Sequence, residues 1–171
     1  MKKSLLMFLI LSVMAIPAAA NMSGCWAEVR APYTANPGDT VVFEIYYENQ
    51  SPDGEGTNSV VAIFPETYTI LQSWYDDLGQ GWDYSFSASG DFGSIAHFDA
   101  TTPQMMPGTG GHFFLEVFIR PNNPCGPFTI RWKQYGDRTG TPDHWISGLI
   151  EYDLCGVPTQ DSNWSSIKSL Y

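Results

Sequence analysis

The amino-acid sequence predicts an all-β protein, an antiparallel β-sandwich, and two observations support this prediction. About nine short segments alternate apolar with polar residues, and turn-forming residues separate them at regular intervals. No segment after residue 20 repeats its apolar residues with the period of a helix. Many short strands joined by turns, without intervening helices, are typical of two packed antiparallel sheets.

The strongest segment is 36–50, and we expect the rest of the fold to be organised around it. It opens with a turn, because Pro37 fixes φ and Gly38 tolerates a positive φ. The side chains then alternate with a period of two, which predicts a half-buried strand. The predicted inner face holds Val41, Phe43, Ile45 and Tyr47, and the outer face holds Val42, Glu44, Tyr46 and Glu48.

Three weaker strands are expected around this segment. Segment 25–33 reads as a first short strand that ends near a proline, and 59–64 is an apolar strand stopped by the next proline. Segment 67–74 places Tyr68 and Ile70 on one face, which predicts another strand.

The following strands are predicted from the same alternation. Segment 82–87 alternates aromatic with polar residues, and 94–99 shows a weaker form of the pattern. Segment 111–120 is the second strong strand, and together with the first it is expected to build the core. The predicted core residues are Val41, Phe43, Ile45, Phe113, Leu115 and Val117.

The last two strands, 128–135 and 146–154, are predicted to form a hairpin that a disulfide closes. With Gly140 at the centre of the turn, antiparallel pairing places residues whose numbers sum to about 280 opposite each other. Cys125 and Cys155 sum to 280, so their thiols are expected to face each other. This bond would stabilise the fold by roughly 3–4 kcal/mol on the chain-entropy model.

The first twenty residues are interpreted as a secretory signal peptide. Two lysines precede a run from Ser4 to Ile16 that is almost wholly apolar, and Pro17 and three alanines follow it. The run is too short to span a bilayer comfortably, which disfavours the alternative of a membrane anchor. The domain is therefore expected at 21–156, with a linker and short C-terminal tag at 157–171 and no transmembrane helix in the mature chain.

The predicted signal peptide implies an extracellular or cell-surface location, and the composition argues against several classes of function. The net charge is −10 and basic residues number only 8, so nucleic acid is not an expected partner. The histidines, His97, His112 and His144, are far apart, and no nucleophile elbow or phosphate-binding loop is present. The sequence therefore predicts no enzymatic activity and no catalytic residues.

A series of turn and strand motifs extends over roughly Ala31 to Pro121. The motifs are Pro37-Gly38-Asp39-Thr40, Asn49, Thr57-Asn58, Val60-Val61, Pro65 and Pro107-Gly108. With these motifs the chain resembles the Ig-like repeat domain of unknown function found in bacterial and archaeal surface proteins. This resemblance implies an Ig-like sandwich that serves surface attachment, adhesion or assembly, with other surface proteins or the protein itself as partner, and no catalytic residues.

The chain departs from this family in two places. An acidic insertion lies between Asn49 and Thr57, and the chain continues past Pro121 into the predicted hairpin. The insertion carries a candidate calcium site, because Asp53, Glu55 and Asn58 offer hard oxygen ligands in one glycine-rich loop. The alternative is a solvated acidic turn, and otherwise no cofactor is expected.

An alternative function is a carbohydrate-binding module with a polysaccharide partner. Trp74, Tyr75 and Trp82 surround the 74–83 loop and would stack on sugar rings if they were exposed on one flat face. Rings buried between the sheets would instead favour a structural or adhesive module.

Two further features concern attachment to the surface. Cys25 is the third cysteine, and residues 22–25 resemble a bacterial lipoprotein signal in which Cys25 would be lipidated. Plain secretion with cleavage after Ala20 is favoured, because the gap between the apolar run and Cys25 is long. In the tail, Trp164, Ile167 and Leu170 repeat at three-residue spacing, which indicates either a frayed end or a docking tag.

Overall fold

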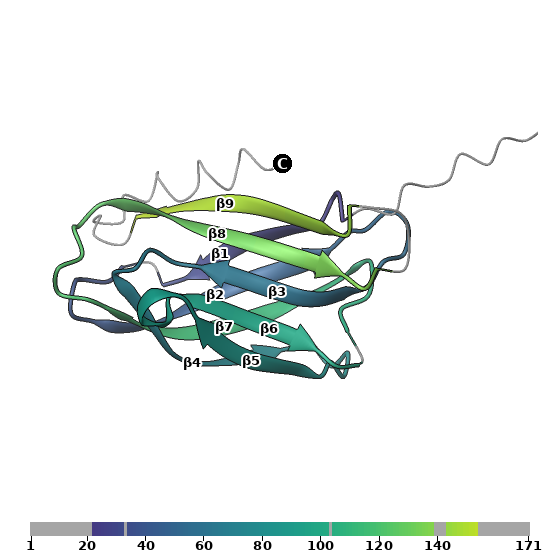
Figure 1. Ribbon diagram of the computed structural model, residues 1–171, viewed down its shortest axis with the longest axis horizontal. Helices are drawn as coiled ribbons and strands as arrows, with labels where there is room; N and C mark the ends of the chain where they lie inside the picture. The colour runs from purple at the N-terminus through teal and green to yellow at the C-terminus, as the bar shows by residue number, and fades with distance from the viewer. Residues whose placement is uncertain (1–21, 33, 103, 139–142, 154–171) are drawn as a thin grey trace, which may run out of the picture.

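The computed structural model is a sandwich of two antiparallel sheets (Figure 1), as the sequence predicts. It describes residues 22–32, 34–102, 104–138 and 143–153. Each predicted segment contains a strand, and the strands are β1 (Trp26–Ala31), β2 (Thr40–Asn49), β3 (Thr57–Ile63), β4 (Tyr68–Asp76), β5 (Tyr84–Ser89), β6 (Ile95–Ala100), β7 (Thr109–Ile119), β8 (Pro127–Gly136) and β9 (Trp145–Asp153). A short 3₁₀ helix, η1 (Asp91–Gly93), precedes β6.

The two sheets contain strands from both halves of the chain. Sheet A has the order β1-β2-β7-β4, and sheet B has the order β5-β6-β3-β8-β9. The connections from β2 to β3 and from β6 to β7 cross between the sheets at the same end of the sandwich as the β8–β9 turn. Loops that are distant in sequence therefore meet at this end, which we call the loop end.

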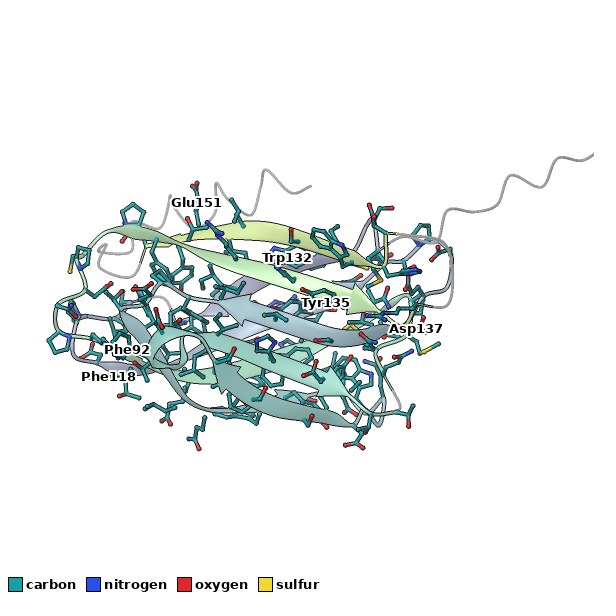
Figure 2. The ribbon with its side chains drawn as sticks, in the orientation of Figure 1. Phe92, Phe118, Trp132, Tyr135, Asp137 and Glu151 are labelled. Atoms are coloured by element: carbon teal, nitrogen blue, oxygen red, sulfur yellow. The ribbon has the colours of Figure 1, made fainter. Side chains whose placement is uncertain are left out.

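The core lies between the sheets and is built from side chains of both layers. Figure 2 draws the side chains that project from the strands. β2 pairs with β7 over ten residues, from Thr40↔Phe118 to Asn49↔Thr109. All but one of the six predicted core residues have no exposed area; Val41 is half-buried and packs against the others. The alternation of apolar residues along these two strands therefore predicted the core.

A β-bulge in β4 changes which side chains face the core. The pairing of β4 with β7 shifts between Ile70 and Gln72, so Leu71 is an extra residue and its side chain is 53% exposed. Before the bulge Tyr68 and Ile70 point inward, whereas after it Tyr75 does.

The hairpin of β8 and β9 has the predicted register. Its pairs run from Pro127↔Asp153 to Tyr135↔Trp145, and each pair sums to 280. Cys155 lies outside the described residues, among which no two cysteines are bonded to each other. The described part of the chain also contains no helix that is long and apolar enough to cross a membrane.

Replacing Phe43 with alanine should lower the free energy of unfolding by about 3–5 kcal/mol, because the ring is fully buried and its removal leaves a cavity. Urea unfolding followed by circular dichroism measures this loss. Val42→Ala is the matched control, since the neighbouring side chain is 37% exposed. Equal losses in the two variants would contradict the assignment of inner and outer faces.

Candidate functional site

Asn49, the last residue of β2, joins three segments at the loop end. Its amide Nδ2 donates to the carbonyl oxygens of Glu55 (2.8 Å) and Met105 (3.1 Å). Its Oδ1 accepts from the backbone N–H of Ser51 (2.9 Å) and from the thiol of Cys25 (3.3 Å). Asn49 also begins a glycosylation sequon, but its side chain is fully buried and its amide is engaged, so the folded domain does not offer it to a glycan.

The thiol of Cys25 lies within this buried network. Burial raises its pKa to about 11, and the charges of Glu55 and Asp53 add to the rise. The thiol is therefore neutral at physiological pH and only 3% of the residue is exposed. A lipidated sulfur could not remain in this buried position, so plain secretion without lipidation remains the favoured prediction.

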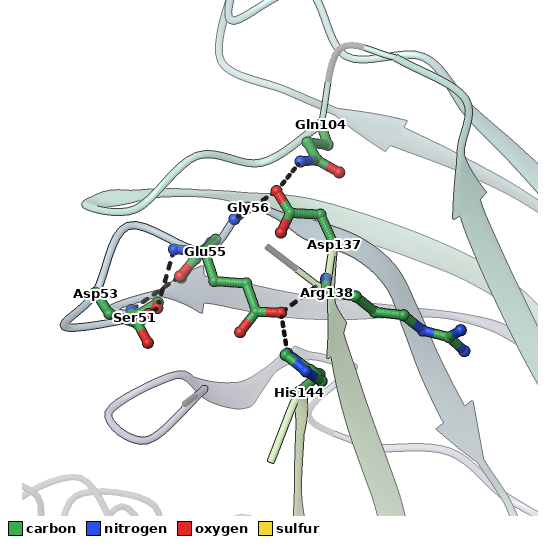
Figure 3. A network of polar contacts seen from close by, with 9 residues as sticks. Ser51, Asp53, Glu55, Gly56, Gln104, Asp137, Arg138 and His144 are labelled. Carbon is green, nitrogen blue, oxygen red and sulfur yellow. Dashed lines mark hydrogen bonds and ion pairs between the residues drawn. The ribbon is translucent and has the colours of Figure 1, made fainter. Parts of the chain in front are cut away.

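Glu55 anchors the β8–β9 turn to the β2–β3 loop (Figure 3). Its Oε1 accepts from the backbone N–H of Arg138 at 2.9 Å and lies 2.9 Å from Nδ1 of His144. The side chain of Glu55 has no exposed area, whereas that of His144 is 24% exposed. Gly136 permits this approach, because a Cβ at that position would clash with the Glu55 carboxylate.

A second acidic residue strengthens the same junction. Oδ2 of Asp137 accepts from the backbone N–H of Gly56 at 3.3 Å and from Nε2 of Gln104 at 2.8 Å (Figure 3). Three loops at the loop end are thereby held together, and each of them contributes at least one side chain. We call Glu55, Asp137 and His144, with their partners, the latch.

The three predicted calcium ligands take different roles. Glu55 belongs to the latch, Asn58 lines a groove on the outer face of sheet B, and Asp53 accepts from the hydroxyl of Ser51 at 2.6 Å. Oε2 of Glu55 and Oδ2 of Asp53 are buried without a hydrogen-bond partner. Among the described residues, no three His, Cys, Asp or Glu side chains form a group that could hold a metal ion. Calcium binding stays a prediction.

The groove on the outer face of sheet B has a volume of about 880 Å³. Acidic and basic side chains line it together with aromatic and aliphatic ones. The latch shapes its rim, because His144 and Arg138 belong to both. The lining residues that carry polar or aromatic groups are Asn58, Ser59, His97, Asp99, Lys133, Tyr135, Arg138, Asp143, His144 and Trp145.

The three rings predicted to stack on sugars do not form a platform, and this corrects the prediction. Trp74 is 43% exposed, but Trp82 is only 6% exposed and stacks on the core ring of Phe113 at 6.0 Å between centroids. The hydroxyl of Tyr75 donates to the carbonyl of Trp82 at 3.0 Å. Tyr75 follows Trp74 directly along a strand, so the two side chains lie on opposite faces. Trp82 enters the core from the β4–β5 loop.

A continuous row of aromatic rings, which was not predicted from the sequence, lies on the outer face of sheet A. Neighbouring rings are Trp26 and Tyr46 (5.3 Å between centroids), Tyr46 and His112 (5.2 Å), His112 and Phe114 (6.2 Å), and Phe114 and Trp74 (5.4 Å). This aromatic row crosses all four strands of sheet A. The strand pairing that builds it is long-range, which periodicity alone does not reveal.

Comparisons with known proteins identify the fold. No family model and no curated protein matches the chain, so its resemblance to the Ig-like repeat family stays a prediction. Among solved structures, a putative membrane-anchored protein from Corynebacterium diphtheriae is similar, with a TM-score of 0.55 and 11% identity. The similarity covers 79% of this chain but 36% of that protein.

Two other similar structures are covered almost completely. An uncharacterised protein from Nocardia farcinica with an immunoglobulin-like fold has a TM-score of 0.52 and 14% identity, over 76% of this chain and 98% of that one. A cohesin module from a family 33 glycoside hydrolase of Clostridium perfringens has a TM-score of 0.52 and 8% identity, over 77% and 96%. At these identities the likeness establishes an Ig-like sandwich and nothing further.

Replacing Glu55 with alanine should lower the free energy of unfolding by about 2 kcal/mol, because it leaves the N–H of Arg138 and the ring of His144 without their acceptor. Chemical denaturation of both proteins measures the difference. Glu66→Ala, on an exposed turn, is the control and should change stability by less than about 0.5 kcal/mol. A variant as stable as wild type would show that the latch does not contribute to stability.

Proposed function

We propose that the protein is a non-catalytic structural or adhesive module, secreted or held at the cell surface, that acts by binding a macromolecular partner. The observation that carries this proposal is the aromatic row on the outer face of sheet A. A sandwich needs rings between its sheets for stability, but rings on an outer face remain in contact with water. Such rings are characteristic of surfaces that bind partners.

The composition of this face agrees with an interface. Tyrosine, tryptophan and arginine are enriched at protein–protein contacts, and all three occur together here as Tyr46, Trp26 and Arg30. The sheet holds the rings in fixed positions, so little conformational freedom would be lost on binding. A rigid aromatic surface of this kind suits an adhesive role.

The predicted signal peptide and the fold comparisons also support the proposal. One structural neighbour is described as membrane-anchored and another as a cohesin module. More specifically, the partner could be a second copy of the chain, because the resemblance to the Ig-like repeat family implies assembly. The alternative of a carbohydrate-binding module at the 74–83 loop is weakened, because only Trp74 of its three rings is substantially exposed.

We also propose that Cys125 and Cys155 form the disulfide that closes the hairpin. Its support is the register of β8 with β9, because two residues beyond the pair Pro127↔Asp153 the same register places Cys125 opposite Cys155. Peptide mapping of the secreted protein under non-reducing conditions should recover these two cysteines in one cross-linked peptide. Cys25 should react with iodoacetamide only after unfolding, since it is buried. A Cys25–Cys155 peptide would refute this pairing.

Labelling of intact cells and fractionation of the source organism test the proposed function. The protein should be found on the surface or in the medium, and deletion of its gene should reduce adhesion or surface assembly. Re-expression of the wild type should restore the phenotype, whereas Trp74→Ala should restore it only in part. Trp145→Ala is the matched control, because this ring is also about half exposed, at 50%, but lies on sheet B.

An exclusively intracellular protein would overturn the proposal, as would a deletion strain with unchanged adhesion and assembly. Equal effects of the two tryptophan variants would indicate that the contact surface is not the aromatic row.

A further inference from the structure

The outer face of sheet A carries an excess of carboxylates around the aromatic row. The alternation of each strand places five acidic side chains on this face. Among the described residues, the basic side chains on the same face are Arg30, from β1, and Arg120, which follows β7 and donates from Nε to the hydroxyl of Thr69 at 3.4 Å. The five acidic residues are Glu28, Glu44, Glu48, Asp76 and Glu116.

Few of these charges are compensated within the chain. Among the described residues, Arg30 with Glu28 is the only ion pair that involves a lysine or arginine, at 2.6 Å. Glu44 lies 2.7 Å from Nδ1 of His112, which belongs to the row itself. The hydroxyl of Tyr46 donates to Glu48 at 3.2 Å. The face therefore keeps a net negative charge beside its aromatic rings.

Arg30 shows how the rings and carboxylates of this face accommodate a guanidinium group within the chain. Its guanidinium lies 4.0 Å from the centroid of the Tyr46 ring, while its Nε pairs with Glu28. A ring face and a carboxylate together are the two features that hold a guanidinium, through cation–π attraction and a charge-assisted hydrogen bond. The same combination recurs across the sheet, where Trp74 and Phe114 lie beside Glu116 and Asp76.

A second copy of the chain docked symmetrically through this face does not fit. Each copy would present the same carboxylates to the other, and opposed like charges disfavour such a contact. The net charge of −10 acts in the same direction. A cationic partner would instead be attracted from a distance and held at the face.

We infer that the outer face of sheet A binds a segment rich in arginine or lysine on a partner protein. This inference rests on the proposed adhesive function and specifies the chemistry of its partner. Cationic side chains of the partner contact the exposed ring of Trp74 and pair with the carboxylates of Glu44 and Glu116. A neutral polysaccharide would contact the rings, but it has no positive charge to pair with the excess carboxylates.

A fluorescent peptide of alternating arginine and serine tests the inference, with the mature full chain as its binding partner and fluorescence anisotropy as the readout. The wild type should bind, and its affinity should fall steadily as the salt concentration rises. A peptide with citrulline in place of arginine should bind weakly, because it keeps the shape and loses the charge. A triple variant with Trp74→Ala, Glu44→Gln and Glu116→Gln should bind roughly tenfold more weakly.

The matched control is Trp145→Ala with Glu151→Gln and Asp153→Asn, which removes one exposed ring and two carboxylates from β9 of sheet B. It should bind the arginine peptide as the wild type does. Circular dichroism and urea unfolding establish that both triple variants are folded. If the sheet A variant is unfolded, Glu44→Gln with Glu116→Gln alone should still weaken binding several-fold.

Three results would overturn the inference. One is equal binding by the two triple variants, which would indicate non-specific attraction to an acidic protein. Another is tight binding of the citrulline peptide or of an insoluble neutral glucan through Trp74, which would indicate recognition without charge. The third is no binding of the arginine peptide. If adhesion in cells still depends on Trp74, the adhesive function stands and only the nature of the partner is wrong.

Discussion

The pairing of β2 with β7 is the interaction on which the other parts of the structure depend. Its ten residue pairs place these two strands at the centre of sheet A. Their inward side chains, such as Phe43 and Phe113, form the middle of the core. Their outward side chains, Tyr46 and His112 among them, form the middle of the aromatic row. One ladder of backbone hydrogen bonds thus sets the positions of both the core residues and the residues of the proposed binding face.

Polar interactions of buried side chains join the loops at the loop end. A carboxylate with no exposed area is costly unless it is bonded, and Glu55 bonds to the β8–β9 turn across 83 and 89 positions of the chain. Asn49 similarly satisfies four hydrogen bonds with its one amide group. These side chains hold the loops in register beside the buried apolar residues at the same end, such as Met105.

The sequence predicted the architecture well because alternation along a strand is a local property. Each predicted segment contains a strand, and the register of the last hairpin followed from the position of one turn. The site was predicted less well, because its residues meet only through long-range pairing. Glu55 lies in a loop of turn-forming residues and was expected to be a calcium ligand or part of a solvated turn, but it is buried beside His144, far along the chain.

The rings illustrate the same limit. Tyr75 was grouped with Trp74 because they are adjacent in sequence, although adjacent strand residues face opposite ways. Trp82 was a candidate stacking residue beside the 74–83 loop on the condition that it was exposed, yet it lies in the core. The aromatic row assembles Trp26 and Trp74 from opposite edges of sheet A, and no sequence spacing connects them.

The bulge at Leu71 determines which aromatic side chain of β4 lies on the outer face of sheet A. In an uninterrupted β4, the alternation that points Tyr68 and Ile70 inward would also point Trp74 inward and Tyr75 outward. The extra residue reverses this phase, so an indole rather than a phenol ends the row at the open edge of sheet A. A β4 that kept Leu71 without the bulge would exchange the two rings, whereas loss of the codon for Leu71 would remove the bulge and leave both rings on their present faces. The side chains that reach the outer face of sheet A are therefore determined by the phase of alternation along β4 as well as by the amino-acid composition of the strand.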